Sequence, residues 1–252
     1  MKIIFIFIVT SIIFCCKESN NKKVIPLKEQ LTFLKDTFLE KPEHDRQMSI
    51  RRKATTGQPE GIPVILLDFN GHTVSGTSWN VYGDIIAAPS GLNAAQQQEV
   101  IDTVIAHYTG LNVLVTKEEN KYKKAPDFQR MRCIITTSYE WYSNSFAGVA
   151  YLNSFTWGDN TPCFVFSSLV NFNNKKIRDA TSHEVGHTLG LRHQSLYDIT
   201  CVKISDYNPG GNGIAPIMGI SYYEPHAIWW IGPNNVSCTT IQNDTLIIKS
   251  KL

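Results

Sequence analysis

The feature that most constrains this chain is the run Ser182–His193, which reads SHEVGHTLGLRH. If this run is helical, His183 and His187 lie about 40° apart on one face, one turn from each other. Two imidazoles in this arrangement can bind one metal ion. Glu184 is next to the first histidine and can reach a water molecule on that ion. The spacing therefore predicts the first part of a metal site on a helix.

A third histidine follows after a glycine. His193 lies six residues beyond His187, so a continuous helix would carry it to another face. Gly190 lies between them, and glycine adopts positive φ without steric cost and commonly ends helices. We therefore expect the chain to turn at Gly190 and to return His193 to the ion. Three histidines leave a fourth position for water, as in catalytic zinc sites.

The alternative is a solvated helix that carries its histidines by chance. The added glycine and third histidine, at fixed offsets, make a chance match rarer by about three orders of magnitude at ordinary residue usage. Imidazole ligands favour zinc over magnesium or calcium. We therefore predict one catalytic Zn²⁺, and the sequence leaves calcium binding open.

Residues 183–193 resemble the long zinc motif HExxHxxGxxH of the metzincin metallopeptidases. That family also has a methionine-containing turn beneath the metal, and Ala215–Gly219 (APIMG) matches it 25 residues after His193, counted to Met218. The resemblance implies that Met218 is a hydrophobic base and not a ligand. It also implies an α+β zincin fold: a mixed, mostly parallel, five-stranded twisted sheet with an antiparallel edge strand, two main helices including the active-site helix, and a small C-terminal subdomain after the third histidine.

The apolar runs agree with such a sheet. Residues 63–69, 112–116 and 132–136 predict buried strands. A helix between the first two is expected to begin at Asn93, with Gln96 completing a capping box. A strand, helix and strand in this order predict parallel strands joined by a right-handed crossover.

Two further strands are expected at residues 148–155 and 163–169. In metzincins the edge strand lies over the cleft and the substrate binds beside it as an added strand. The resemblance places that substrate edge at Gly148, Val149, Ala150 and Tyr151. An unpaired strand edge offers N–H and C=O groups that an extended peptide can bind. The alternative is an ordinary hairpin strand.

Tyr222 follows the methionine turn and is a candidate for binding the oxyanion or the substrate. In astacins and serralysins, which are metzincins, a tyrosine two residues after the methionine hydrogen-bonds the oxyanion. Here Ile220 occupies that offset and Tyr222 is four residues after Met218, so the role does not carry over by position. The alternative is a packed or surface tyrosine.

The N-terminus predicts export. Residues 3–14 form a short apolar run, too short to span a bilayer but typical of a signal peptide. Cys15 and Cys16 close it, which resembles a bacterial lipoprotein signal, and we favour Cys16 as the lipidated residue. We expect a signal peptide at residues 1–16 and an outer-membrane or cell-surface lipoprotein. The alternative is ordinary cleavage and secretion.

Residues 17–57 are expected to form a tether and a short helical pro-segment or linker, ahead of a metallopeptidase domain at 58–252. Leu27, Leu31, Leu34 and Phe38 recur at helical spacing and predict a helix that ends at Glu40. The sequence leaves open whether this segment is inhibitory.

Four cysteines remain after the signal, an even number that suggests two disulfides in an exported protein. Cys201 and Cys238 flank the methionine turn, and we expect them to pair. Cys133 and Cys163 open two predicted strands and could pair if those strands are neighbours. The alternative is four buried thiols.

The net charge of +2, without basic or acidic blocks, gives no reason to expect nucleic acid as a partner. The motif and the resemblance together predict a monomeric zinc-dependent endopeptidase that acts on extracellular proteins or peptides. Glu184 would be the general base, and a lipid anchor the sole membrane contact. The alternatives are a catalytically silent binding protein with the zincin fold and a non-peptidase zinc hydrolase.

Overall fold

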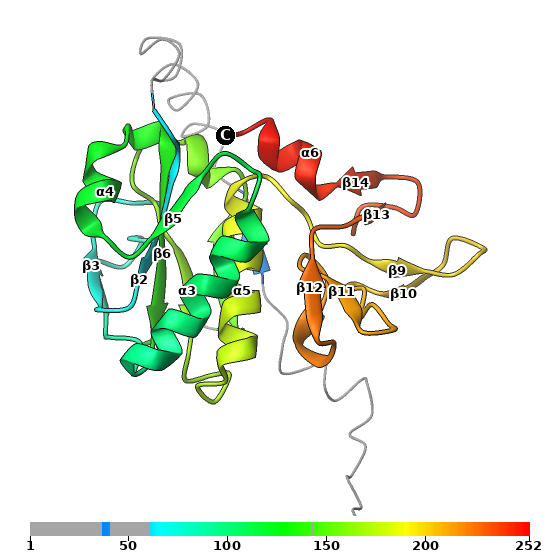
Figure 1. Ribbon diagram of the computed structural model, residues 1–252, viewed down its shortest axis with the longest axis horizontal. Helices are drawn as coiled ribbons and strands as arrows, with labels where there is room; N and C mark the ends of the chain where they lie inside the picture. The colour runs from blue at the N-terminus through cyan, green and yellow to red at the C-terminus, as the bar shows by residue number, and fades with distance from the viewer. Residues whose placement is uncertain (1–36, 41–60, 143) are drawn as a thin grey trace, which may run out of the picture.

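The computed structural model describes residues 37–40, 61–142 and 144–252 (Figure 1). Its central sheet has the strand order β1-β7-β8-β6-β2-β5. These strands are β1 (Thr37–Leu39), β7 (Gly148–Tyr151), β8 (Cys163–Phe166), β6 (Arg130–Thr136), β2 (Val64–Asp68) and β5 (Leu114–Thr116). The strand β7 is antiparallel to β8, and the other pairs are parallel. The predicted sheet of five strands, mostly parallel with one antiparallel strand, is therefore confirmed, and β1 is a sixth strand beyond it.

Two long helices pack on one face of this sheet. These are α3 (Ala94–Tyr108) and α5 (Asn174–Thr188), which lie side by side (Figure 1). The predicted capping box of α3 is present, because Asn93 accepts from the Gln96 N–H and Gln96 accepts from the Asn93 N–H. Both helices bury apolar residues against the side chains on one face of the strands. Val165 of β8 is one of these side chains and lies in the same core cluster as the helix residues.

The opposite face of the sheet carries an aromatic cluster. Phe164 and Phe166 alternate with Val165 along β8 and pack with Trp79 and Trp157. This alternation is the period of two that strands require. A hairpin of β3 (His72–Val74) and β4 (Ile85–Ala87) and the short helix α4 (Glu119–Lys124) complete this side of the domain.

Residues 194–252 form the predicted small C-terminal subdomain, which lies beyond α5 (Figure 1). It contains three two-stranded sheets and a last helix. Its elements are β9 (Leu196–Tyr197), β10 (Lys203–Ser205), β11 (Ile214–Pro216), β12 (His226–Ile228), β13 (Ile231–Pro233), β14 (Ile241–Asn243) and α6 (Asp244–Lys249). Among the described residues, no helix is both long and apolar enough to cross a membrane.

The prediction of a helix that ends at Glu40 is wrong for its last residues. Thr37–Leu39 form β1, which pairs with β7, and the earlier part of that helix lies outside the described residues. A helical spacing of apolar residues reflects local preference, whereas pairing with a strand edge is a tertiary contact that overrides it. The lipidation residue Cys16 and the boundaries at 16 and 57 also lie outside the described residues.

Cys133 and Cys163 lie in register on neighbouring parallel strands, yet both are buried free thiols. Of the two possibilities for this pair, a disulfide or buried thiols, the structure shows the buried thiols. A disulfide brings its two Cβ atoms to about 3.8 Å. Neighbouring strands are about 4.8 Å apart, so in-register side chains stand too far apart without backbone distortion. Burial, with a hydrogen bond that the neutral Cys163 thiol donates to Cys133, raises the pKa of Cys163 well above its ordinary value.

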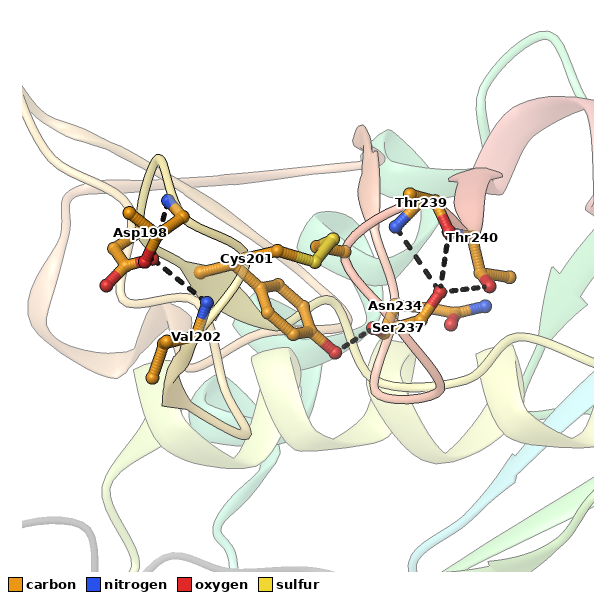
Figure 2. Close-up of a disulfide and its surroundings, with 10 residues drawn as sticks. Asp198, Cys201, Val202, Asn234, Ser237, Thr239 and Thr240 are labelled. Carbon is orange, nitrogen blue, oxygen red and sulfur yellow. Dashed lines mark hydrogen bonds between the residues drawn. A yellow bond between two sulfur atoms is a disulfide. The ribbon is translucent and has the colours of Figure 1, made fainter.

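The predicted disulfide between Cys201 and Cys238 is present, with the two Cα atoms 5.5 Å apart (Figure 2). It links the β9–β10 hairpin to the turn before β14. The Tyr197 hydroxyl donates to the Asn234 carbonyl across the same junction at 2.9 Å. The disulfide closes a loop that contains Met218, with a sequence separation of 37 residues.

We expect the double substitution Cys201→Ser and Cys238→Ser to lower the free energy of unfolding by about 3–4 kcal/mol, because the loop regains its entropy in the unfolded chain. The measurement is urea unfolding of both proteins, with and without reductant. Reductant should shift the midpoint of the natural chain alone. Equal midpoints for the two oxidised proteins would show that the disulfide does not stabilise the fold.

Candidate metal centre and active site

The helix α5 begins at a cap and becomes more buried along its length. The Asn173 side chain accepts from the Lys176 N–H at the start of the helix. Every residue from Asp179 to Thr188 is buried. The helix ends in a tight turn, in which the Leu191 N–H donates to the Gly186 carbonyl and Gly190 has a φ of +98°. Only glycine adopts this backbone readily, so Gly190 directs the chain back toward the helix.

The turn brings the three histidines together. Metal-binding nitrogens of His183, His187 and His193 all lie within 4.8 Å of one another, and all three residues are buried. The Nε2 atoms of His187 and His193 are 3.1 Å apart. The ring centroids of the three pairs are 4.7, 4.8 and 5.3 Å apart. Residues far apart on the motif thus converge on one point.

Backbone carbonyls orient two of the imidazoles. The His183 Nδ1 is 2.6 Å from the Ile217 carbonyl oxygen, and the His187 Nδ1 is 2.7 Å from the Leu191 carbonyl oxygen. A carbonyl only accepts, so each Nδ1 carries the proton and each Nε2 offers a lone pair. This is the pattern by which ligands around a metal are held in one tautomer and one ring orientation.

The spacing of the nitrogens fits a zinc ion. Two nitrogens bound at about 2.05 Å to a tetrahedral ion are about 3.3 Å apart. The 3.1 Å between the Nε2 atoms of His187 and His193 is close to this value. With its proton on Nδ1, His193 would present a second lone pair at this spacing, and a cation between the two nitrogens would be bound by both. Three neutral imidazoles also form a donor set that zinc prefers over calcium or magnesium.

The third histidine is held by a network behind the loop. The Arg192 N–H donates to the Gln242 side-chain oxygen at 2.9 Å, and the Gln194 side-chain amide donates to the Asp244 carboxylate at 2.9 Å. Both neighbours of His193 are therefore anchored, Arg192 to β14 and Gln194 to the first residue of α6. Burial raises the pKa of Asp244, although the hydrogen bonds that it accepts oppose this.

The methionine turn lies against the histidine helix. Met218 is fully buried, and its carbonyl accepts from the Gln194 N–H at 2.7 Å. A Cβ atom at Gly186 would lie 2.6 Å from the Met218 sulfur, so the thioether fills the space that this glycine leaves. The Ile217 carbonyl of the same turn is hydrogen-bonded by the His183 imidazole, so the turn also contacts one of the three histidines directly. The Met218 side chain therefore packs against Gly186 of α5.

The side chain of Glu184 lies between α5 and the start of β7. It is 1% exposed. A Cβ atom at Gly148 would stand 2.6 Å from both the Cγ and the Oε1 of Glu184, and 2.7 Å from the Phe164 carbonyl oxygen. Gly148 therefore leaves the space that the glutamate occupies. The predicted edge residues Gly148–Tyr151 form β7, but β1 pairs with them on the side away from β8.

We expect Gly148→Ala to lower kcat/KM for peptide hydrolysis by about 100-fold, because the added methyl group displaces Glu184 by about 1 Å. The zinc content should stay unchanged, since no ligand moves. Gly211→Ala is the matched control, because a Cβ atom there has no neighbour within 4 Å. The measurement is steady-state hydrolysis with metal analysis of each protein. Similar rates for both variants would contradict the assigned position of Glu184.

Tyr207 was not predicted as a site residue. Its ring is 4.5 Å from that of His193 and 6.5 Å from that of His183, between centroids. It is 6% exposed and packs against Ile220 and Tyr222. Tyr222 is half-buried and lines a pocket together with His183, Tyr207 and Ser221. The sequence gives one indication that Tyr207 belongs to the site: it is an aromatic residue in a loop made mostly of polar residues.

A comparison with protein families agrees with this arrangement. The model of a family described as dual-action HEIGH metallo-peptidase matches residues 70–222, which is more than half of the chain. In this chain, residues 183–187 read HEVGH. The matched range contains the three histidines, Glu184 and Met218. No curated protein matches the chain.

Proposed function

Because the chain belongs to the dual-action HEIGH metallopeptidase family, we propose that it is a zinc-dependent endopeptidase of the metzincin type. The observation that carries this proposal is the convergence of His183, His187 and His193 beside Glu184. The methionine turn beneath α5 supports the metzincin type. The substrates proposed are extracellular proteins or peptides.

The three histidines would hold the ion through their nitrogens, with one position left open. When bound, zinc supplies a Lewis acid that polarises a peptide carbonyl and lowers the pKa of water to about 7. Glu184 accepts the proton of the attacking water on a carboxylate oxygen and delivers it to the amine that leaves. The backbone of β7 restricts the position of that carboxylate through Gly148. Tyr222, which packs with Tyr207 beside His193, is proposed to contact the substrate.

Export is part of the same proposal, with residues 1–16 as the signal peptide and Cys16 as the lipidated residue. The disulfide between Cys201 and Cys238 supports it, because such bonds persist outside the reducing cytosol. Mass spectrometry of the purified mature protein would test it. A lipid-modified N-terminal cysteine is expected at residue 16, and an unmodified N-terminus would contradict the anchor.

The experiment that tests the peptidase proposal is hydrolysis of casein by the purified chain, followed by mass spectrometry of the products. We expect internal cleavages that stop when a chelator removes the metal and resume when zinc is added. Cleavage that persists in chelator would reject the proposal. Zinc binding without cleavage across a broad peptide library would favour a binding protein, and turnover confined to esters or simple amides would favour a non-peptidase hydrolase.

A further inference from the structure

The loop that carries His193 is paired with a turn of the C-terminal subdomain, residues 234–240, which we call the support turn. The Asn235 N–H donates to the His193 carbonyl at 2.9 Å. One residue further along the loop, Gln194 forms an isolated antiparallel bridge with Asn234. The support turn therefore bonds the backbone of the third histidine itself, in addition to the side-chain network that anchors its two neighbours.

The support turn is closed by its own hydrogen bonds and contains no helix. The Asn234 N–H donates to the Thr240 carbonyl at 3.0 Å, and the Ser237 hydroxyl accepts from the Thr240 N–H at 3.1 Å (Figure 2). Such a turn keeps its shape locally, but its position relative to the rest of the subdomain depends on cross-links to other segments.

A covalent bond and a hydrogen bond tie the support turn to the hairpin of β9 and β10. The covalent bond is the disulfide between Cys201 and Cys238 (Figure 2). The hydrogen bond is the one of 2.9 Å that the Tyr197 hydroxyl donates to the Asn234 carbonyl. The disulfide and the His193 carbonyl therefore hold the same short turn, separated by three residues between Asn235 and Cys238 at most.

We propose that the support turn and its disulfide position the third zinc ligand, so that the zinc affinity depends on the redox state of Cys201 and Cys238. The proposal rests on the proposed function, because it concerns the same ion, and it adds a link between that site and thiol chemistry. With the disulfide intact, the loop of His193 is ordered before the ion binds. Without it, binding must order the loop, and that cost lowers the affinity.

The disulfide is accessible to a reductant, because Cys201 is exposed and Cys238 is half-buried. Two molecules of glutathione reduce it, and each gives up one electron and one proton. The S–S bond breaks, both cysteines become thiols, and the two glutathione sulfurs join as oxidised glutathione. Linkage makes the effect reciprocal: bound zinc must disfavour this reduction by the same factor by which the disulfide tightens zinc binding.

The first test compares the zinc affinity of the full natural chain with that of the double variant Cys201→Ser and Cys238→Ser, by competition with a chromophoric chelator. Serine leaves no thiol at these positions to bind zinc itself. We expect the double variant to bind zinc about tenfold more weakly, the lower end of the range for residues that support a metal ligand. Equal affinities would overturn the proposal.

Leu66→Ala is the control for a general loss of stability. Leu66 is buried in the small core cluster beneath α4, which is separate from the cluster that contains Met218 and α5. Its truncation leaves a cavity and destabilises the fold, but it touches neither the support turn nor the histidines. The zinc affinity of Leu66→Ala should equal that of the natural chain. A loss as large as that of the double-serine variant would overturn the positioning role.

Tyr197→Phe keeps the disulfide and decides the matter if the double-serine variant does not fold. It removes the hydroxyl that bonds the Asn234 carbonyl and changes nothing else in the cross-link. Zinc binding should weaken by about 2- to 5-fold, the effect of one lost hydrogen bond in the support. Tyr82→Phe is the matched control, because Tyr82 is fully exposed between β3 and β4. Equal affinities of the two phenylalanine variants would overturn the proposal.

The reciprocal effect is measured on the natural chain, metal-free and zinc-loaded. Each form is equilibrated with buffers of reduced and oxidised glutathione, and the reduced fraction of Cys201 and Cys238 is found by alkylation and mass spectrometry. The equilibrium constant for reduction should be about tenfold smaller for the zinc-loaded chain, and equal constants would overturn the proposal. Casein hydrolysis separates this claim from the peptidase. Hydrolysis with unlinked zinc affinities rejects the positioning role alone, whereas linked affinities without hydrolysis reject the peptidase alone.

Discussion

Glu184→Gln is expected to lower kcat/KM for peptide hydrolysis by about 10²- to 10⁴-fold, the usual contribution of a positioned general base. Glutamine preserves the shape of a side chain that is 1% exposed and contacts Gly148. It cannot accept the proton of the attacking water or return it to the leaving amine. The loss should fall on kcat, because the group acts in the transition state and makes no uniform contribution to substrate binding.

The zinc content of Glu184→Gln should equal that of the natural chain, because none of the three histidines is changed. Glu99→Gln is the control, since Glu99 is a half-exposed residue on α3 that pairs with Arg178. It should change kcat/KM by less than about twofold. A fully active Glu184→Gln variant would falsify the assignment of the general base.

His193→Ala is expected to reduce zinc affinity by more than about 100-fold. Changing a residue that only hydrogen-bonds a metal ligand typically lowers metal affinity by about 10- to 100-fold, and the loss of a ligand itself should cost more. Hydrolysis at limiting zinc should be lost in parallel. The reason is geometric: His193 comes from the loop after Gly190, while the other two histidines lie one turn apart on α5. Two ligands from a single helix leave the ion open on the opposite side.

The measurement for His193→Ala is competition for zinc with a chromophoric chelator, combined with activity at each zinc concentration. His226→Ala is the matched control, since His226 is exposed on β12 and is not among the three clustered histidines. It should retain the affinity of the natural chain. If His193→Ala bound zinc as tightly as His226→Ala, the ion would be held elsewhere.

The local parts of the metal centre could be predicted from the sequence. The distance between His183 and His187 along a helix is set by helix geometry, and Gly190 signals a turn by its conformational freedom. The capping box at Asn93 is likewise a matter of residues three positions apart. Each prediction depends on neighbours in the chain, so tertiary packing had little opportunity to change it.

The parts that could not be predicted depend on contacts between distant segments. Phe38 continues a helical spacing of leucines in the sequence. In the structure it lies in β1, opposite Ala150 of β7, which is more than 100 residues away in the chain. Tyr207 belongs to a loop whose path depends on the Asn208 N–H bonding the Gln194 carbonyl and on Gly219 packing beneath it. No pattern in the sequence specifies such pairings.

The most direct test of the metal centre is X-ray absorption at the zinc edge of the purified full chain. We predict three imidazole nitrogens and one oxygen at about 2.0–2.2 Å, and two imidazoles in His193→Ala. A sulfur ligand at about 2.3 Å, or fewer than three imidazoles in the natural chain, would contradict the convergence of His183, His187 and His193 on one ion.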